Sequence, residues 1–113
     1  MHGIRLAGDF ERLRRAGRTV RSGGLRIRAL LDDVDGSYVA FAIGRSYGNA
    51  VQRNRIKRRL RNLLVMIDRD GGLAPGWYLF SVGHGVEERH LESMNWSELG
   101  HVVMSGLNEL SGV

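Results

Sequence analysis

The segment from residue 48 to residue 67 constrains this chain most, because it combines a helical apolar period with a dense run of positive charge. Six basic side chains lie between Arg53 and Arg61. At about 100° per residue, they surround an apolar stripe on a single helix face. The residues of that stripe are Ile56, Leu60, Leu63, Leu64 and Ile67. The pattern predicts a helix that buries one face and holds basic flanks in water.

Individual positions in this segment have distinct expected roles. Asn49 follows Gly48 and is a candidate N-cap, because its side chain can accept a hydrogen bond from the first turn. Arg53 points along the apolar direction one turn before Ile56, so we expect it at the rim of the core. The flank residues are Asn54, Lys57, Arg58 and Arg61 on one side, and Arg55 and Arg59 on the other.

The basic run contains no acidic residue that could form ion pairs at helical spacing. Like charges one turn apart repel each other and destabilise the helix. A polyanion would offset this repulsion, and phosphate is the obvious candidate because contacts with lysine and arginine release its counterions. An ordinary solvated basic face is the competing interpretation, and the spacing alone leaves both open.

Charge is distributed unevenly along the 113 residues, although the net charge is +5. Residues 1–63 hold fifteen basic and five acidic side chains, whereas residues 64–113 hold two basic and seven acidic ones. Any electrostatic attraction for a partner must therefore arise from the N-terminal part. The chain has no cysteine, no signal-peptide pattern and no apolar run approaching about 18 residues, so we expect a soluble, cytoplasmic protein.

The N-terminal part predicts a short helix followed by strands. Residues 1–8 show no period and are expected to form a loose or extended lead-in. Asp9 is a candidate cap for a helix over residues 10–16, with Phe10 and Leu13 facing the core. Strands are expected over residues 18–20, 25–31 and 38–45. In the second of these, Arg26 and Arg28 point outward, which suits either a solvated sheet or one wall of a nucleic-acid groove.

The C-terminal part completes a layered α+β pattern. Residues 77–82 predict a buried strand, and residues 84–94 a polar connection. Asn95 with Glu98 resembles a capping box before a final amphipathic helix. We therefore predict one α+β domain, an α-β sandwich of order αβββαβα, with helices covering part of a four-stranded sheet.

Recognisable catalytic or metal-binding motifs are missing from the sequence. It contains no HExxH, Walker or GxSxG pattern. Asp32, Asp33 and Asp35 lack the spacing and closing glutamate of a calcium loop, so a turn at Gly36 explains them better. His84 and His90 have no partner spacing for zinc and are expected to be loop residues. The sequence thus predicts binding chemistry and no catalytic centre in the protein.

The string GNAVQRNRIKRRLR resembles the signature of the bacterial ribonuclease P protein component. A generic basic helix has no reason to carry Gly-Asn-Ala-Val before Arg-Asn-Arg, which makes the resemblance specific. A weaker likeness extends from about residue 4 to residue 110. The matching residues are Gly48, Asn49, Ala50, Val51, Arg53, Asn54, Arg55, Ile56, Lys57, Arg58 and Arg61.

The resemblance implies the fold, the partners and the site. Residues 1–113 would form one RNA-binding domain with a rare left-handed β–α–β crossover. A catalytic RNA with Mg²⁺ would remove the 5′ leader of precursor tRNA, while the protein binds that RNA and guides the leader, with no protein-bound cofactor, no membrane and no required protein oligomer. Phe10 and Arg28 are the expected leader-cleft residues. The expected RNA contacts are Arg45, Arg53, Asn54, Arg55, Lys57, Arg58 and Arg61.

Three positions depart from the family pattern and bear on leader binding. Arg14 replaces an aromatic residue, Arg28 stands near another common aromatic position, and Ser46 replaces a basic residue. Guanidinium planes can also stack on bases, so the leader contacts could rely on arginine. Phe10 could equally be a plain packing residue.

Three other functions compete with this interpretation. A stand-alone RNA-binding or ribosome-associated protein could use the same basic helix. A DNA-binding helix-turn-helix would need a second helix a short turn earlier, where the sequence predicts a strand. A protein nuclease would need metal ligands or an acid–base pair that the sequence does not show.

Overall fold

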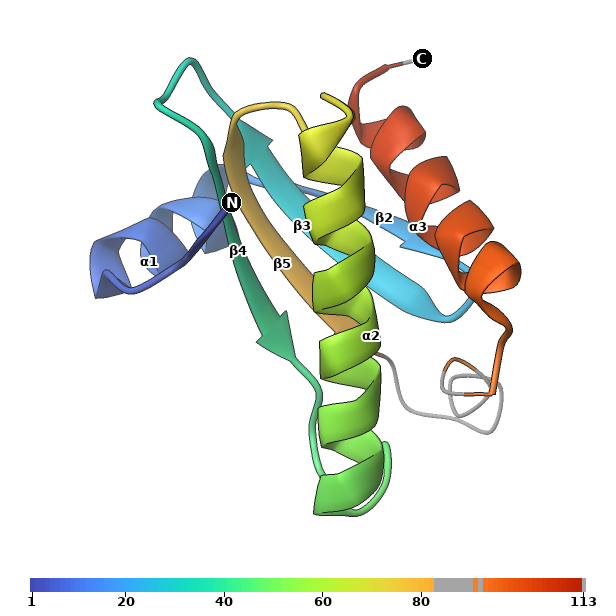
Figure 1. Cartoon of the computed structure of the whole chain (residues 1–113). Helices are drawn as coiled ribbons and strands as arrows, with labels where there is room; N and C mark the ends of the chain where they lie inside the picture. The colour runs from blue at the N-terminus through green and yellow to red at the C-terminus, as the bar shows by residue number, and fades with distance from the viewer. Residues whose placement is uncertain (83–90, 92, 113) are drawn as a thin grey trace.

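The structure is a computed structural model that describes residues 1–82, 91 and 93–112, and it forms a layered α+β fold (Figure 1). Helices α2 and α3 cover one face of a central sheet, and α1 lies against the other face. The predicted α-β sandwich is therefore confirmed. The elements in chain order are β1 (His2–Gly3), α1 (Ala7–Ala16), β2 (Arg18–Ser22), β3 (Leu25–Leu31), β4 (Ser37–Ala42), α2 (Ala50–Arg69), β5 (Gly76–Val82) and α3 (Trp96–Leu110).

The N-terminal residues differ from the prediction in two ways. The sheet has five strands in the order β1-β4-β5-β3-β2, because His2 and Gly3 pair in parallel with β4. Of the predicted loose or extended lead-in, the extended alternative is confirmed for residues 2–3, whereas the predicted four-stranded sheet was wrong because two residues are too few to show a strand period. Helix α1 begins at Ala7, and Asp9 does not cap it. Asp9 instead lies in the first turn, where the helix dipole favours a carboxylate, and pairs with Arg12 at 3.1 Å.

Strands β4 and β5 are parallel neighbours joined by α2. Figure 1 views the sheet from the side of α2, with both strands running downward and β5 to the right of β4. When this view is rotated so that both strands point upward, α2 still lies in front of the sheet, and β5 lies to the left of β4. The crossover is thus left-handed, against the strong general preference for right-handed connections, and the expectation from the family resemblance is confirmed.

The main core lies between the sheet and the two helices α2 and α3. In β3, Leu25, Ile27 and Ala29 are buried on this side, while the arginines of the strand point to the other face. The predicted apolar stripe of α2 is confirmed in full, since the buried residues of the helix are Ile56, Leu60, Leu63, Leu64 and Ile67.

The start of α2 is fixed by a reciprocal cap. Asn49 accepts a hydrogen bond from the Gln52 N–H at 2.9 Å, and the Gln52 side chain accepts one from the Asn49 N–H at 2.9 Å. Strand β4 ends at Ala42, three residues before the predicted limit, and the chain then turns with Tyr47 buried. The Asn49 cap and the buried Tyr47 side chain together fix the start of α2, and therefore where its basic side chains point.

The remaining connections agree with the sequence where the structure describes them. Asn95 caps α3 by accepting a hydrogen bond from the Glu98 N–H at 2.8 Å, and α3 packs on β2 and β3. Residues 32–36 form an exposed bend in which the Asp33 N–H donates to Asp32. His84 and His90 lie outside the described residues. No helix in the described part of the chain is both long and apolar enough to span a membrane.

Candidate nucleic-acid interface

Helix α2 presents most of its cations to solvent. Asn54, Arg55, Arg58 and Arg61 are exposed, while Lys57 is half-buried. Within the described residues, no carboxylate forms an ion pair with Arg55, Arg58 or Arg61. Their charges therefore remain available to an external anion. We refer to Arg45, Arg53, Asn54, Arg55, Lys57, Arg58 and Arg61 as the basic surface.

Arg53 lies at the rim of the core, as predicted. The residue is half-buried, and its Nε atom is buried without a hydrogen-bond partner among the described residues. A buried donor of this kind is costly unless it finds an acceptor. An oxygen of a bound ligand is one acceptor that would satisfy it. Arg45 is exposed in the turn that leads into α2.

Arg59 has a different role from its neighbours on α2. Its two terminal nitrogens donate to the main-chain carbonyls of Leu91, at 3.3 Å, and Met94, at 2.6 Å. These bonds connect α2 to the segment that precedes α3. Arg59 thus stabilises the fold. Its predicted place on a flank held in water was wrong, because the segment before α3 packs against this side of the helix.

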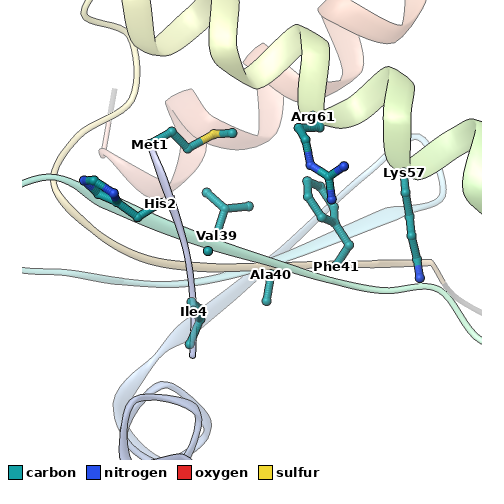
Figure 2. A pocket seen from close by; sticks show the side chains of 9 residues that line it. Met1, His2, Ile4, Val39, Ala40, Phe41, Lys57 and Arg61 are labelled. Carbon is teal, nitrogen blue, oxygen red and sulfur yellow. The ribbon is translucent and has the colours of Figure 1, made fainter. Parts of the chain in front are cut away.

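Two cations of the basic surface lie over the sheet edge. Lys57 and Arg61 are one helical turn apart and extend from α2 toward β4 (Figure 2). The Arg61 guanidinium lies 5.6 Å from the centre of the Phe41 ring, a cation–π contact. Phe41 was not identified as a site residue from sequence. In the structure it packs against the main core on the face that α2 covers.

A hollow lies beside α1, on the face of the sheet opposite to α2. It has a volume of about 350 Å³ and a mostly apolar lining. Phe10 is 39% exposed at this hollow, so its expected position facing the core was wrong, whereas Leu13 is buried as predicted. The hollow brings together the two expected leader-cleft residues, Phe10 and Arg28. Its lining is completed by Ala7, Glu11, Leu13, Arg14 and Leu79.

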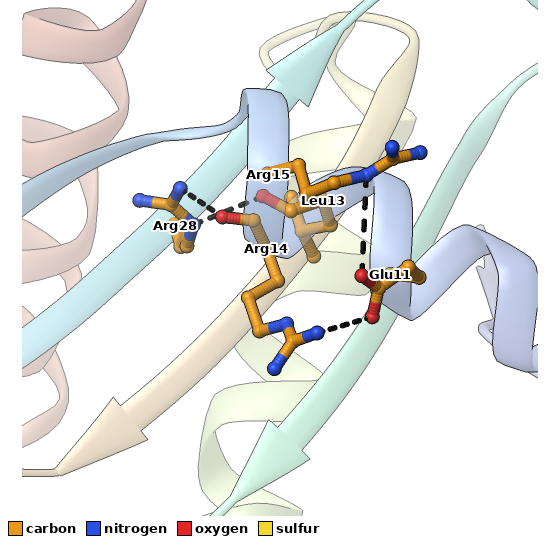
Figure 3. Close-up of polar contacts among 5 residues, drawn as sticks. All are labelled: Glu11, Leu13, Arg14, Arg15 and Arg28. Atoms are coloured by element: carbon orange, nitrogen blue, oxygen red, sulfur yellow. Dashed lines mark hydrogen bonds and ion pairs between the residues drawn. The ribbon is translucent and has the colours of Figure 1, made fainter.

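The Arg28 guanidinium is bound within the protein (Figure 3). Its nitrogens donate to the carbonyls of Leu13 at 2.9 Å and Arg14 at 2.6 Å, and to the Thr19 hydroxyl at 2.8 Å. A cation at the end of a helix can hydrogen-bond to the last carbonyls and interacts favourably with the dipole. The Leu13 carbonyl also accepts the Gly17 N–H at 2.9 Å. Arg28 points away from the main core, as predicted, but α1 packs over this face of the sheet, so the guanidinium contacts protein there.

The charges of α1 beside this hollow are partly neutralised. Arg14 donates to Glu11 at 2.6 Å, and Arg15 approaches the same carboxylate at 3.9 Å (Figure 3). The hydrogen bond from Arg14, reinforced by its charge, lowers the pKa of Glu11. This hollow therefore offers mainly apolar and aromatic surface, whereas the exposed cations Arg55, Arg58 and Arg61 of α2 pair with no carboxylate among the residues that the structure describes.

Planar side chains form a ladder that the sequence did not reveal. His2 lies 5.2 Å from Tyr38, Tyr38 lies 6.2 Å from Trp77, and the Arg12 guanidinium lies 4.6 Å from the Trp77 ring. The ladder depends on the pairing of β1 with β4 and on the packing of α1. Neither contact has a local sequence signal.

The fold and the basic surface define a small basic α+β protein built around a left-handed β–α–β unit. Solved structures of bacterial ribonuclease P proteins share this fold. The Staphylococcus aureus protein superposes with a TM-score of 0.76 at 17% identity, covering 96% of this chain and 94% of that one. The Thermotoga maritima protein gives 0.75 at 18% identity, with coverage of 100% and 98%.

Sequence comparison assigns the family. The family model for ribonuclease P matches residues 2–102. The ribonuclease P protein component of Streptococcus thermophilus is 32% identical over 95 residues, or 84% of this chain and 83% of that protein. The chain belongs to the ribonuclease P protein family.

Other curated relatives align over a shorter stretch. The Gluconacetobacter diazotrophicus protein is 37% identical over 70 residues, which span 61% of this chain and 60% of that protein. The Syntrophobacter fumaroxidans protein is 36% identical over 58 residues, which span 51% of this chain and 49% of that protein.

Proposed function

We propose that this chain is the RNA-binding protein subunit of a ribonucleoprotein endoribonuclease, ribonuclease P, that removes the 5′ leader from precursor tRNA. The observation that carries the proposal is the basic surface, on a helix whose start and buried face are both fixed: no carboxylate in the described part of the chain pairs with its Arg55, Arg58 or Arg61. Family membership supplies the reaction, and the surface supplies a physical reason for an RNA partner.

The basic surface would bind the catalytic RNA. Arg55, Arg58 and Arg61 project from a rigid helix, so little conformational order is lost beyond their own side chains when they meet phosphate. Each contact releases counterions from the RNA. Neutralised phosphates let the catalytic RNA and the precursor approach each other, and the Mg²⁺ required for that approach falls.

The hollow beside α1 would guide the leader. Phe10 offers a half-exposed ring on which a base can stack, and such stacking is tolerant of base identity. The Arg28 guanidinium is hydrogen-bonded to the end of α1, so its contribution is to position α1, which carries Phe10 at the side of the hollow. The two RNA surfaces lie on opposite faces of the sheet, which suits the binding of two RNA segments at once.

Bond cleavage is assigned to the RNA subunit, with Mg²⁺ held by RNA phosphates. Among the described residues, no group of three histidine or acidic side chains lies close enough to hold a metal ion. The protein's contribution is binding and orientation in the cytoplasm, where its substrate is made. No protein oligomer is needed for this role.

A reconstitution assay tests the proposal. The chain is mixed with a bacterial ribonuclease P RNA, and cleavage of precursor tRNA is measured at low Mg²⁺. We expect faster cleavage with the chain, and no cleavage by the chain and metal alone. RNA binding without stimulation would favour a stand-alone RNA-binding protein, and 5′ processing by the chain alone would favour a protein nuclease.

Charge variants sharpen the assay. Arg55→Gln removes one cation that pairs with no carboxylate among the described residues, and it should raise the Mg²⁺ concentration needed for half-maximal cleavage. Arg69→Gln is the matched control, because it removes one charge from an arginine that is exposed in the last turn of the same helix, outside the basic surface. Equal effects of the two variants would contradict a specific role for the surface.

A further inference from the structure

A pocket lies where the edge of the sheet meets α2 (Figure 2). Its volume is about 400 Å³, within the range of ligand sites in proteins. Val39 and Phe41 of β4 line its apolar side, and the main chain of residues 1–4 forms its outer wall. Lys57 and Arg61 extend into it from α2. The expected RNA contacts included the two cations but neither the aromatic residue nor the edge strand.

We propose that this pocket binds one nucleotide of an RNA strand, with its phosphate between Lys57 and Arg61 and its base against the Arg61–Phe41 pair. The inference rests on the proposed function and adds a site for a base to a surface that otherwise contacts phosphate. A pocket of this kind would make binding depend on unpaired bases as well as on charge.

The charges around the pocket favour phosphate. Lys57 and Arg61 are one turn apart on the same flank, where their repulsion is relieved by an anion between them. The Asp68 carboxylate, farther along α2, is 3.1 Å from the Met1 amine. Its negative charge is thus offset by the amine and does not oppose the binding of phosphate. The pocket also continues into the exposed cations of the basic surface, which makes an extended polyanion a better fit than an isolated carboxylate.

The planar groups favour a base. The Phe41 ring packs on Phe80, with ring centres 5.8 Å apart, and the Arg61 guanidinium lies over Phe41. A guanidinium held in place by an aromatic ring can stack on a nucleobase at its open face. Such a group needs less ordering on binding than a free arginine.

The edge strand adds groups that could hydrogen-bond to the base. The Ile4 N–H donates to the Val39 carbonyl at 3.1 Å, and successive residues of a strand direct their polar groups to alternate edges. The Gly3 N–H and carbonyl therefore face away from β4, at the outer edge of the sheet. A Cβ atom at Gly3 would meet nothing within 4 Å, so a ligand has access to this main chain.

The test measures binding of the full chain to a short oligoadenylate and to an abasic strand of the same length. Arg61→Lys keeps the charge and removes the planar guanidinium. We expect it to weaken oligoadenylate binding about fivefold or more, the scale of one stacked base. It should leave the salt dependence and the affinity for the abasic strand unchanged.

Lys57→Gln should act differently, because it removes a phosphate contact. For both strands, the slope of log affinity against log salt should become shallower by about 0.7. Arg69→Gln, the same charge loss outside the pocket, should leave the slope unchanged. Phe41→Leu should reproduce the base-dependent loss, and a urea midpoint close to wild type would show that its fold is intact.

Several results would overturn the inference. Equal losses on both strands for Arg61→Lys would show that no base is bound. An acidic peptide of equal charge that binds as tightly as oligoadenylate would identify carboxylate as the ligand. If the wild-type chain stimulates precursor cleavage while all pocket variants bind like wild type, only this inference fails. If the wild-type chain neither binds RNA nor stimulates cleavage, the proposed function fails as well.

Discussion

Arg28 clamps the end of α1 to the sheet, and Arg28→Met tests this role. Methionine keeps an unbranched apolar stem and removes the guanidinium, so three hydrogen bonds are lost. A typical hydrogen bond contributes about 0.5–1.5 kcal/mol net, and two of these three are exposed, which places them at the lower end. We therefore expect the free energy of unfolding to fall by about 2 kcal/mol.

Urea unfolding measures this loss if wild type and variant have the same m-value. Arg21→Met is the matched control, because Arg21 is an exposed arginine of the adjacent strand β2. It should change the free energy of unfolding by less than about 0.5 kcal/mol. A loss for Arg28→Met no larger than that of the control would refute the clamp.

The clamp also predicts a functional signature. If Arg28 positions α1, Arg28→Met should reduce the ratio of binding affinities for precursor tRNA over leaderless tRNA. The reason is that Phe10, which α1 carries, would shift away from the leader. The salt dependence of leader binding should not change, since no phosphate contact is lost. A slope shallower by about 0.7 would instead show that Arg28 contacts the leader backbone.

Four further predictions address binding, the cap, the backbone and the alkaline limit. Arg55→Ala should weaken RNA binding with a salt slope shallower by about 0.7–0.9, and an unchanged slope would place Arg55 away from phosphate. Asn49→Ala removes the cap of α2 and should lower the free energy of unfolding, measured in urea, by about 1 kcal/mol. Gly76→Ala places a Cβ atom 2.4 Å from a main-chain oxygen at a φ of +145°, so a loss above about 2 kcal/mol is expected in the same assay. Burial raises the pKa of Tyr78 to about 12, above the unfolded value of about 10, so its stabilising contribution is complete below pH 10 and is lost as the pH rises toward 12. The urea midpoint of Tyr78→Phe should therefore fall less between pH 9.5 and 11.5 than that of wild type.

The sequence predicted α2 well, because a period sustained over five buried residues overrides local ambiguity. The cap at Asn49 was equally accessible, since it depends on neighbours within one turn. The chirality of the crossover had no such signal. Periodicity is identical for either hand, so only the family resemblance indicated the left-handed form.

The errors share a physical cause in contacts between distant segments. Residues 2–3 form β1 because β4 offers a free edge, and no property of these two residues predicts that pairing. Alternation correctly placed Arg28 on the second face of β3 but could not show that the end of α1 covers this position. Phe10 has an apolar side chain on a helix, yet only the packing of α1 decides that its ring stays half exposed.

The arginines of this chain divide by the partners that the fold offers them. Arg12 and Arg14 have a carboxylate one turn away, and Arg28 and Arg59 have main-chain carbonyls within reach. Arg55 and Arg58 have neither among the described residues, although the same helix begins and packs in a fully determined way. Composition alone therefore cannot identify the RNA contacts, because most of the seventeen basic residues are arginine in either role. Within the described residues, a helix with a fixed start and a fixed buried face thus holds Arg55 and Arg58 without a carboxylate or carbonyl partner, and this is the physical basis for assigning a polyanionic partner to α2.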